Sequence, residues 1–329
     1  MSILVTGGAG YIGSHMVLRL ADAGETVVVL DNLTTGFDWA IDHRATLVEG
    51  NAGDMELMAR LIEQHAIEAI VHFAGSIVVP ESVSDPLKYY ANNTATSRNL
   101  IEAAVRGGVK HIVFSSTAAV YGNASLEPVG EDMPLKPESP YGRSKLMTEM
   151  MLADVAAAHP LTYGVLRYFN VSGADPQLRS GQSSPLATHL IKVASQAALG
   201  QRDGVGIFGT DFPTPDGTGV RDYIHVTDLI EAHALLLEHL RSGGESVTMN
   251  CGYGQGYSVR QVIEVVKRIS GAEFPAIEQP RRAGDPASIV ARADKIRAVL
   301  GWQPAHDDLD EIISTALAWE KKLQTRNRL

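Results

Sequence analysis

The chain has 329 residues, of which 45% are hydrophobic, and it carries a formal net charge of −10 at neutral pH. This length suits one large α/β body with a smaller second domain, whereas the acidic charge argues against nucleic acid as a partner. A single cysteine, Cys251, excludes an intrachain disulfide, and because we find neither a signal peptide nor a membrane-length apolar run, we expect a cytoplasmic protein with no membrane partner.

The N-terminal residues predict a strand, a glycine-rich turn and a helix. Apolar residues predict the strand over residues 2–6, and an amphipathic pattern predicts the helix over residues 11–23. Gly7, Gly10 and Gly13 have the spacing G-x-x-G-x-x-G between these two elements. In this context such a turn places a dinucleotide pyrophosphate at the N-terminus of the helix.

The next strand, expected over residues 26–30, indicates which dinucleotide is bound. It is followed by Asp31, whose carboxylate can accept hydrogen bonds from the adenosine ribose hydroxyls but would repel a 2′-phosphate. No Arg or Lys occurs between Asp31 and Arg44 to bind such a phosphate. We therefore expect NAD rather than NADP as the cofactor.

Apolar runs continue to alternate with helical patterns, which predicts a doubly wound parallel Rossmann sheet of the α/β class. Further strands are expected over residues 46–49, 68–72, 110–115 and 162–167, and further helices over residues 54–65, 86–107 and 140–158. Polar or glycine-rich residues follow these strands repeatedly, at the edge where parallel sheets bind ligands.

The sequence changes after Asn170 to a stretch rich in Ser, Gly and Pro, which indicates a lid or a linker. We therefore expect an NAD-binding domain over residues 1–170 and a smaller mixed α/β substrate domain over residues 171–329. Some of the later segments are expected to pack back on the first domain.

A tyrosine and a lysine lie four residues apart at the start of the helix expected over residues 140–158. Ser139 can cap this helix and Pro140 suits its first turn, so Tyr141 and Lys145 fall on one face. The ammonium can make the phenol a base by lowering its pKa, and a shift of about three units requires roughly 4 kcal/mol. The alternative is an exposed pair on a solvated helix face.

Several motifs resemble those of the UDP-glucose 4-epimerases, within the extended short-chain dehydrogenase/reductase superfamily. The likeness includes the glycine-rich turn, Tyr141-x-x-x-Lys145 and residues 72–75, 114–122, 166–170, 217–226, 280–286 and 300–302. It implies a homodimeric enzyme that interconverts UDP-glucose and UDP-galactose. Tightly bound NAD would oxidise the sugar at C4, the 4-keto sugar would rotate, and hydride would return to its other face.

The resemblance also implies roles for individual residues. Tyr141 would take the proton of the sugar 4-hydroxyl, Lys145 would bind the nicotinamide ribose, and Thr117 would hydrogen-bond the same sugar oxygen. The residues implied to line NAD are Gly7, Gly10, Tyr11, Ile12, Gly13, Asp31, Asn32, Asn51, Ala52, Phe73, Ala74, Gly75, Asn92, Tyr141, Lys145, Tyr168 and Phe169. Those implied to line the UDP-sugar are Thr117, Tyr141, Asn170, His189, Leu190, Phe208, Arg221, Tyr223, Arg282, Asp285 and Ile289.

Three positions depart from the family pattern. Asn51 stands where aspartate is common, although its side-chain oxygen can still accept from the adenine amino group. Ile77 stands where some members have lysine, so one cofactor contact is expected to be absent. His189 replaces an amide near the uracil, and a histidine on the helix surface is the alternative.

Other assignments have ordinary structural alternatives. Arg221 could pair with Asp222, Arg282 could be an exposed loop charge, and Ile289 could pack within a strand. We assign His15, His72 and His225 to packing, and expect no metal site, because these residues lack paired spacing and neighbouring carboxylates.

The sequence also bears on related reactions. A 4,6-dehydratase would need an acid/base carboxylate pair directly after Thr117, where this chain has Ala118 and Ala119. A 4-epimerase of N-acetylhexosamines or uronates, or a UDP-uronate decarboxylase, remains an alternative. An NAD-sensing regulator is disfavoured because Tyr141 and Lys145 are both present.

Overall fold

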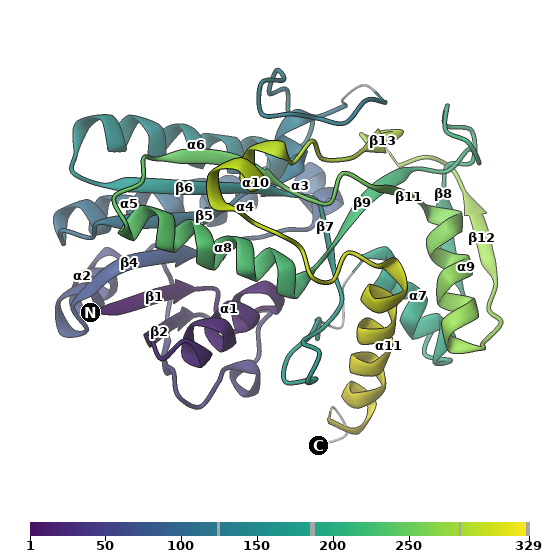
Figure 1. Ribbon diagram of the computed structural model, residues 1–329, viewed down its shortest axis with the longest axis horizontal. Coiled ribbons are helices and arrows are strands. Elements are labelled where there is room, and N and C mark those ends of the chain that lie inside the picture. Colours follow the sequence, from purple (N-terminus) through teal and green to yellow (C-terminus); the bar gives the residue numbers. More distant parts are fainter. Residues whose placement is uncertain (124–125, 185–187, 283, 327–329) are drawn as a thin grey trace.

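The computed structural model describes residues 1–329 apart from 124–125, 185–187, 283 and 327–329 (Figure 1). Its largest unit is a sheet of seven parallel strands in the order β10-β6-β5-β4-β1-β2-β3. These strands are β1 (Ser2–Thr6), β2 (Thr26–Asp31), β3 (Thr46–Glu49), β4 (Ile67–His72), β5 (His111–Ser115), β6 (Thr162–Tyr168) and β10 (Val247–Cys251). The first six confirm the strands expected from the sequence to within one residue at each end.

Helices cover both faces of this sheet because its strands are apolar on both sides. In β1, Ile3 and Val5 face a core shared with helices α1 and α8, whereas Leu4 faces a core shared with α2, α5 and α6. These helices are α1 (Tyr11–Asp22), α2 (Met55–Gln64), α5 (Thr96–Arg106), α6 (Pro140–Ala158) and α8 (Val226–Arg241). The expected α/β class with a doubly wound sheet is therefore confirmed.

The helix expected over residues 86–107 is confirmed to within one residue, and a short π-helix lies within it. The chain forms α3 (Val79–Ser84), α4 (Pro86–Tyr89), a π-helix (Tyr90–Ala95) and then α5. The buried Asn93 side chain lies in this π segment, where its oxygen accepts from Ser76 N at 2.7 Å and its nitrogen donates to Ser144 Oγ at 3.0 Å. Such π segments recur at functional sites.

The remaining elements form a smaller mixed α/β unit. Strand β9 pairs with β7, β11 and β13, and β8 pairs with β12. A separate apolar core joins α7, α9 and α11. The elements are β7 (Asn170–Ser172), α7 (Leu190–Ala198), β8 (Val205–Phe208), β9 (Val220–His225), β11 (Gly256–Ser258), α9 (Val259–Ser270), β12 (Ala276–Gln279), β13 (Ser288–Ile289) and α11 (Leu309–Arg326). Helix α10 (Asp294–Leu300) packs instead against β10 and α8 of the large unit.

The large sheet takes in residues far beyond Asn170. Strand β10 pairs with β6, and α8 packs against α1 on one face of the sheet (Figure 1). The sequence analysis did not identify β10, whose five residues follow α8 and are separated from β6 in the sequence by elements of the smaller unit. A domain boundary at residue 170 stays a prediction.

The loop after β7 fastens the smaller unit to the start of α1. The Tyr11 hydroxyl donates to Gly173 O at 2.7 Å, and Asp175 N donates to His15 Nε2 at 3.1 Å. His15 is buried at this junction. His72 and His225, which were also assigned to packing, are buried as well. The start of α1 and the loop after β7 are therefore linked by hydrogen bonds.

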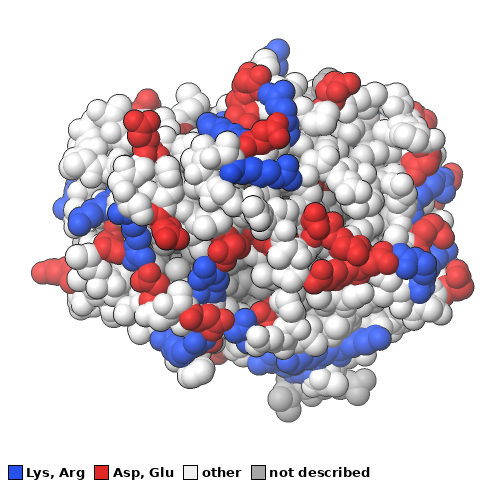
Figure 2. Space-filling model, in the orientation of Figure 1, with Lys and Arg blue, Asp and Glu red and all other residues white. Residues whose placement is uncertain are grey.

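Charged residues of both signs are interspersed on the face shown in Figure 2. Many of them pair, as Arg19 on α1 does with Glu231 on α8 at 2.7 Å. On this face, an anionic ligand would therefore be met by particular cations rather than by a broad basic surface. Among the helices that the structure describes, we find none long and apolar enough to cross a membrane.

Candidate functional site

The turn between β1 and α1 and the start of that helix are packed too closely at two positions, Gly7 and Gly13, for any residue larger than glycine. Gly7 has φ +72°, and a Cβ added there would lie 2.7 Å from Ala74 N. A Cβ added to Gly13 would lie 2.1 Å from Gly7 O. Gly10 precedes α1 without a side-chain cap, so the first backbone N–H groups of the helix keep their capacity to bind an anion.

Asp31 is held at the end of β2 by backbone donors. Its Oδ2 accepts from Ala9 N at 2.9 Å and its Oδ1 accepts from Leu33 N at 2.8 Å. The side chain is buried beside the glycine turn, and each carboxylate oxygen retains a lone pair for a further donor. Next to it, the Asn32 side chain accepts from Thr34 N at 3.1 Å.

Asn51 occupies a turn that uses part of its hydrogen-bonding capacity. Its Oδ1 accepts from Gly53 N at 2.8 Å, so the oxygen assigned to the adenine amino group already has one donor. Ala52 beside it is buried. Ile77, at the position where lysine occurs in some relatives, is 53% exposed.

The residues that follow β4 meet the expected catalytic residues. A Cβ added to Gly75 would lie 3.8 Å from Lys145 Nζ, which places this backbone beside the ammonium. Asn92 Nδ2 donates to Ser76 Oγ at 2.9 Å. The Phe73 and Tyr168 rings both pack on the buried His233 of α8, with ring centroids 5.0 Å and 6.3 Å away. The sequence analysis did not identify this histidine.

Helix α6 begins as the sequence predicts. Ser139 caps it by accepting from Gly142 N at 3.1 Å, and Pro140 is its first residue. Tyr141 is 7% exposed and Lys145 is 3% exposed, so the alternative of a solvated surface pair was wrong. The Tyr141 ring also packs edge-on against Tyr89.

The pKa of the Tyr141 phenol is raised in the protein alone, contrary to the expectation that Lys145 lowers it. Burial raises this pKa, and a hydrogen bond with the Thr117 hydroxyl lowers it by less. Lys145 Nζ donates to Ser115 O at 2.9 Å and lies 4.8 Å from the Phe114 ring centroid. Burial lowers the pKa of Lys145 to about 8, partly offset by Glu149.

A buried network behind Lys145 was not identified from the sequence. Glu149 lies one turn after Lys145 and accepts from Arg167 Nη2 at 2.6 Å and from the Ser116 hydroxyl. Arg167 Nη1 donates in turn to the Tyr121 hydroxyl at 3.1 Å. The available signal was an arginine within an otherwise apolar strand, which requires a buried anion as its partner.

The two arginines assigned to the substrate have partners in the smaller unit. Arg221 Nη2 lies 2.7 Å from Asp285 Oδ1, so the alternative pairing with Asp222 was wrong. Asp222 is instead buried, and its carboxylate accepts from three backbone N–H groups, including Gly254 N at 2.9 Å. The Arg282 guanidinium lies 3.6 Å from the Phe208 ring centroid. Its neighbour Ala283 lies outside the described residues.

Strand β9 brings four of the expected substrate residues together. Asn170 of β7 pairs with Tyr223, and Ile289 of β13 pairs with Arg221. Tyr223 and Ile289 are 2% and 8% exposed, so both also belong to apolar cores. Asn170 directly follows Phe169, which joins this group to the end of β6.

His189 and Leu190 begin helix α7. His189 is the N-cap residue and is half-buried, which excludes a fully exposed helix-surface position. Its Nδ1 lies 2.7 Å from Gln182 Nε2.

Among the described residues, contacts around the large sheet link the glycine-rich turn with Tyr141, Thr117 and Lys145. The residues assigned to the substrate are held mainly by the smaller unit.

Comparison with known proteins places this arrangement among related chains. The model of the "NAD dependent epimerase/dehydratase family" matches residues 3–252. The chain is 57% identical over 322 residues to UDP-glucose 4-epimerase of Azospirillum brasilense, covering 98% of this chain and 92% of that protein.

Two solved structures illustrate the likeness in fold. UDP-glucose 4-epimerase from Brucella ovis in complex with NAD has a TM-score of 0.93 and 44% identity, covering 96% of this chain and 97% of the other. UDP-glucose 4-epimerase from Thermotoga maritima with UDP-glucose has a TM-score of 0.89 and 34% identity, covering 98% of this chain and 100% of the other.

Proposed function

This chain belongs to the NAD dependent epimerase/dehydratase family, and we propose that it interconverts UDP-glucose and UDP-galactose while NAD stays bound. The observation that carries this proposal is the cluster at the carboxyl end of β5, where Thr117, Tyr141 and Lys145 are all buried and Lys145 Nζ donates to Ser115 O at 2.9 Å. A base and a lysine ammonium next to a dinucleotide-binding turn are suited to removing the proton of a sugar hydroxyl.

The residues of the large sheet fit NAD. The pyrophosphate would meet the N-terminus of α1 across Gly7, Gly10 and Gly13, and a Cβ at Gly7 or Gly13 would clash with backbone atoms of the protein that shape this turn. Asp31 would accept from the adenosine ribose hydroxyls with its remaining lone pairs. Bound NAD supplies the hydride acceptor and donor, together with a positive ring that favours the ionised phenol.

Tyr141, Thr117 and Lys145 divide the handling of the proton. Tyr141 takes the 4-hydroxyl proton and later returns it, while the Thr117 hydroxyl bonds the same sugar oxygen. Burial keeps water from the phenol, and Lys145 stabilises its ionised form. Glu149 opposes the loss of charge from Lys145, because a buried carboxylate favours a nearby ammonium.

The UDP moiety would be bound by the smaller unit. Arg221 and Arg282 offer forked donors to the diphosphate, while Asn170, Leu190 and Phe208 line the nucleotide. Arg221 reaches the diphosphate by giving up part of its contact with Asp285. Asp285 is then free to accept from a ribose or sugar hydroxyl.

An apolar surface suits a second copy of this chain. Val83, Leu87 and Met150 are 61%, 77% and 59% exposed, and they lie on the neighbouring helices α3, α4 and α6. A hollow in this part of the structure is lined by Tyr90, Thr94, Ala95, Arg98, Met147 and Met151. Exposed apolar groups of this kind mark interaction sites, so we propose a cytoplasmic homodimer joined through these helices. Light scattering of Met150→Asp and of the unchanged protein tests the assembly, because the variant should dissociate.

One experiment tests the activity. The purified protein is incubated with UDP-galactose, UDP-N-acetylgalactosamine and UDP-glucuronate without added cofactor, and the products are identified. UDP-glucose should form from UDP-galactose, and denaturation should release NAD(H) with little NADP(H). Conversion of UDP-glucuronate alone, or stoichiometric NADP in the purified protein, would contradict the proposal.

A further inference from the structure

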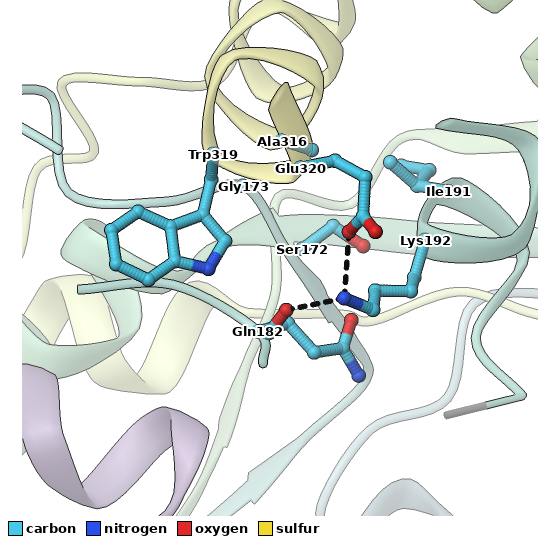
Figure 3. A pocket seen from close by; sticks show the side chains of 8 residues that line it. All are labelled: Ser172, Gly173, Gln182, Ile191, Lys192, Ala316, Trp319 and Glu320. Carbon is cyan, nitrogen blue, oxygen red and sulfur yellow. Dashed lines mark hydrogen bonds and ion pairs between the residues drawn. The ribbon is translucent and has the colours of Figure 1, made fainter. Parts of the chain in front are cut away.

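A lysine and a glutamate form a buried ion pair between α7 and α11 (Figure 3). Lys192 Nζ lies 2.6 Å from Glu320 Oε2, and the two residues are 5% and 4% exposed. Burial lowers the pKa of Lys192, and the bond to Glu320 raises it. Because desolvation costs such a pair much of its attraction, a well-packed apolar pair could replace it with little loss of stability. Stability alone therefore does not account for these charges.

The ammonium makes a second bond that an apolar side chain could not make. Lys192 Nζ donates to the main-chain oxygen of Gln182 at 2.7 Å, as the second dashed line in Figure 3 marks. The next residue, Ser183, is held by helix α11, because Trp319 Nε1 of that helix donates to Ser183 Oγ at 3.2 Å. Helix α11 thus fixes the main chain at Gln182 through Glu320 and Trp319.

The side chain of Gln182 connects this fixed main chain with the His189 ring. Its Nε2 lies 2.7 Å from His189 Nδ1, and an amide nitrogen only donates. His189 Nδ1 is then the acceptor and the ring proton resides on Nε2, where it can donate to a carbonyl. His189 is also the residue before Leu190 at the start of α7.

We propose that Lys192, held by Glu320, is a positioning residue for the uracil ring of the UDP-sugar. It sets the main chain at Gln182, and the Gln182 amide then sets the orientation and tautomer of His189. This inference rests on the proposed function, because it takes the UDP-binding side of the site to lie at His189 and Leu190.

The test uses the full-length protein with its bound NAD. Two variants break the relay at different points: the double substitution Lys192→Met with Glu320→Leu, and Gln182→Leu, which leaves the buried pair intact. The dissociation constant of UDP is measured by calorimetry, together with KM and kcat for UDP-galactose and the NAD content. Both variants should raise the UDP dissociation constant and KM about 5- to 10-fold, the scale of one lost hydrogen bond, while kcat and NAD content stay within about twofold.

Gln196→Met is the matched control. Gln196 Nε2 donates to the other oxygen of the Glu320 carboxylate at 3.3 Å, so this variant loosens the contact between α7 and α11 while Lys192 keeps Gln182. Its UDP affinity should stay close to that of the unchanged protein.

The outcomes separate two failures. If the unchanged protein does not bind UDP, the proposed function fails and the inference falls with it. If it binds UDP but Gln182→Leu binds it equally well, the relay is overturned and the proposed function stands. An equal loss of affinity in Gln196→Met, or a fall in kcat with loss of NAD, would assign Lys192 and Glu320 to packing and also overturn the relay.

Discussion

The charged groups around Lys145, beside the large sheet, and those around Arg221, in the smaller unit, are held in different ways. Lys145 is 3% exposed, and the ion pair of Glu149 with Arg167 behind it has side chains 6% and 7% exposed. In the smaller unit, Arg221 and Asp285 pair with side chains that are 13% and 32% exposed.

The difference suggests two modes of action. Around Lys145 the polar groups are fixed before any ligand arrives, which is the condition for electrostatic stabilisation without reorganisation. The Arg221 guanidinium is already paired with the Asp285 carboxylate, so an anionic ligand must displace this carboxylate in order to bind the arginine. Substitutions near the sheet should therefore abolish function, whereas those in the smaller unit should reduce affinity by degrees.

The largest expected effect is that of Tyr141→Phe. The variant keeps the ring and loses the proton acceptor, so kcat should fall by about 10²- to 10⁴-fold while bound NAD is retained. The adjacent Tyr89 is the control, because its hydroxyl donates to Val78 O at 2.6 Å and to Glu81, and Tyr89→Phe should keep most activity. Turnover of Tyr141→Phe within a few-fold of the unchanged enzyme would rule out Tyr141 as the base.

Gly13→Ala should lower NAD retention next. The added methyl group would lie 2.1 Å from Gly7 O, and overpacking of this kind costs about 1–3 kcal/mol, or about 5- to 100-fold in affinity. Gly10→Ala, whose Cβ would lie 3.2 Å from the same oxygen, should have a smaller effect. NAD content after gel filtration measures both. Equal retention in the two variants would show that the turn adapts.

Arg282→Ala tests the smaller unit with a neighbouring control. Loss of a charged donor to the diphosphate should raise KM about tenfold, with kcat nearly unchanged. Arg281 also lies over an aromatic ring, that of Phe212 at 4.1 Å, but it pairs with Asp211 at 2.6 Å. Arg281→Ala should therefore change KM by less than about twofold. The same KM for both variants would count against Arg282 as a diphosphate ligand.

Mild acid should destabilise the fold. Burial lowers the pKa of His15 and His233 to about 4 and that of His72 and His225 to about 3, from 6.5. Between pH 6.5 and these values the unfolded chain binds more protons, so the free energy of unfolding falls as the pH falls. Asp222 has the opposite effect on the free energy of unfolding, because burial raises its pKa to about 6, but it is a single group and the histidines named here are four.

Thermal unfolding between pH 7 and pH 4.5 measures this dependence. His233→Phe should reduce the slope of melting temperature against pH, because one buried titrating group is lost. His43→Gln should leave it unchanged, since the His43 side chain is 92% exposed. A melting temperature that rises on acidification would refute the histidine account.

The smallest effect is expected at Ile289, which lies beside Arg221 but is only 8% exposed. If its side chain walls the pocket near the 2-substituent of the sugar, Ile289→Tyr should lower kcat/KM for UDP-N-acetylglucosamine by a few-fold more than for UDP-glucose, and Ile289→Ala should shift the ratio the other way. Equal changes for both sugars would assign the residue to the core.

Local spacing in the sequence determined the features that depend on neighbouring residues. The glycine turn, the carboxylate at Asp31 and the cap at Ser139 each need only a few residues in a fixed order, because backbone conformation and hydrogen bonding there are local. Six strands and four helices followed from the periodicity of the apolar residues. The likeness of motifs then indicated the chemistry of the site.

Only the tertiary structure decided which distant charges meet. The sequence left a pairing of Arg221 with its neighbour Asp222 open as an alternative, but the register of β9 and β13 gives it Asp285, 64 positions away. The raised pKa of Tyr141 likewise follows from burial, which the four-residue spacing to Lys145 does not reveal. Partner choice and desolvation depend on which surfaces pack together, and these are properties of the folded chain rather than of any short segment.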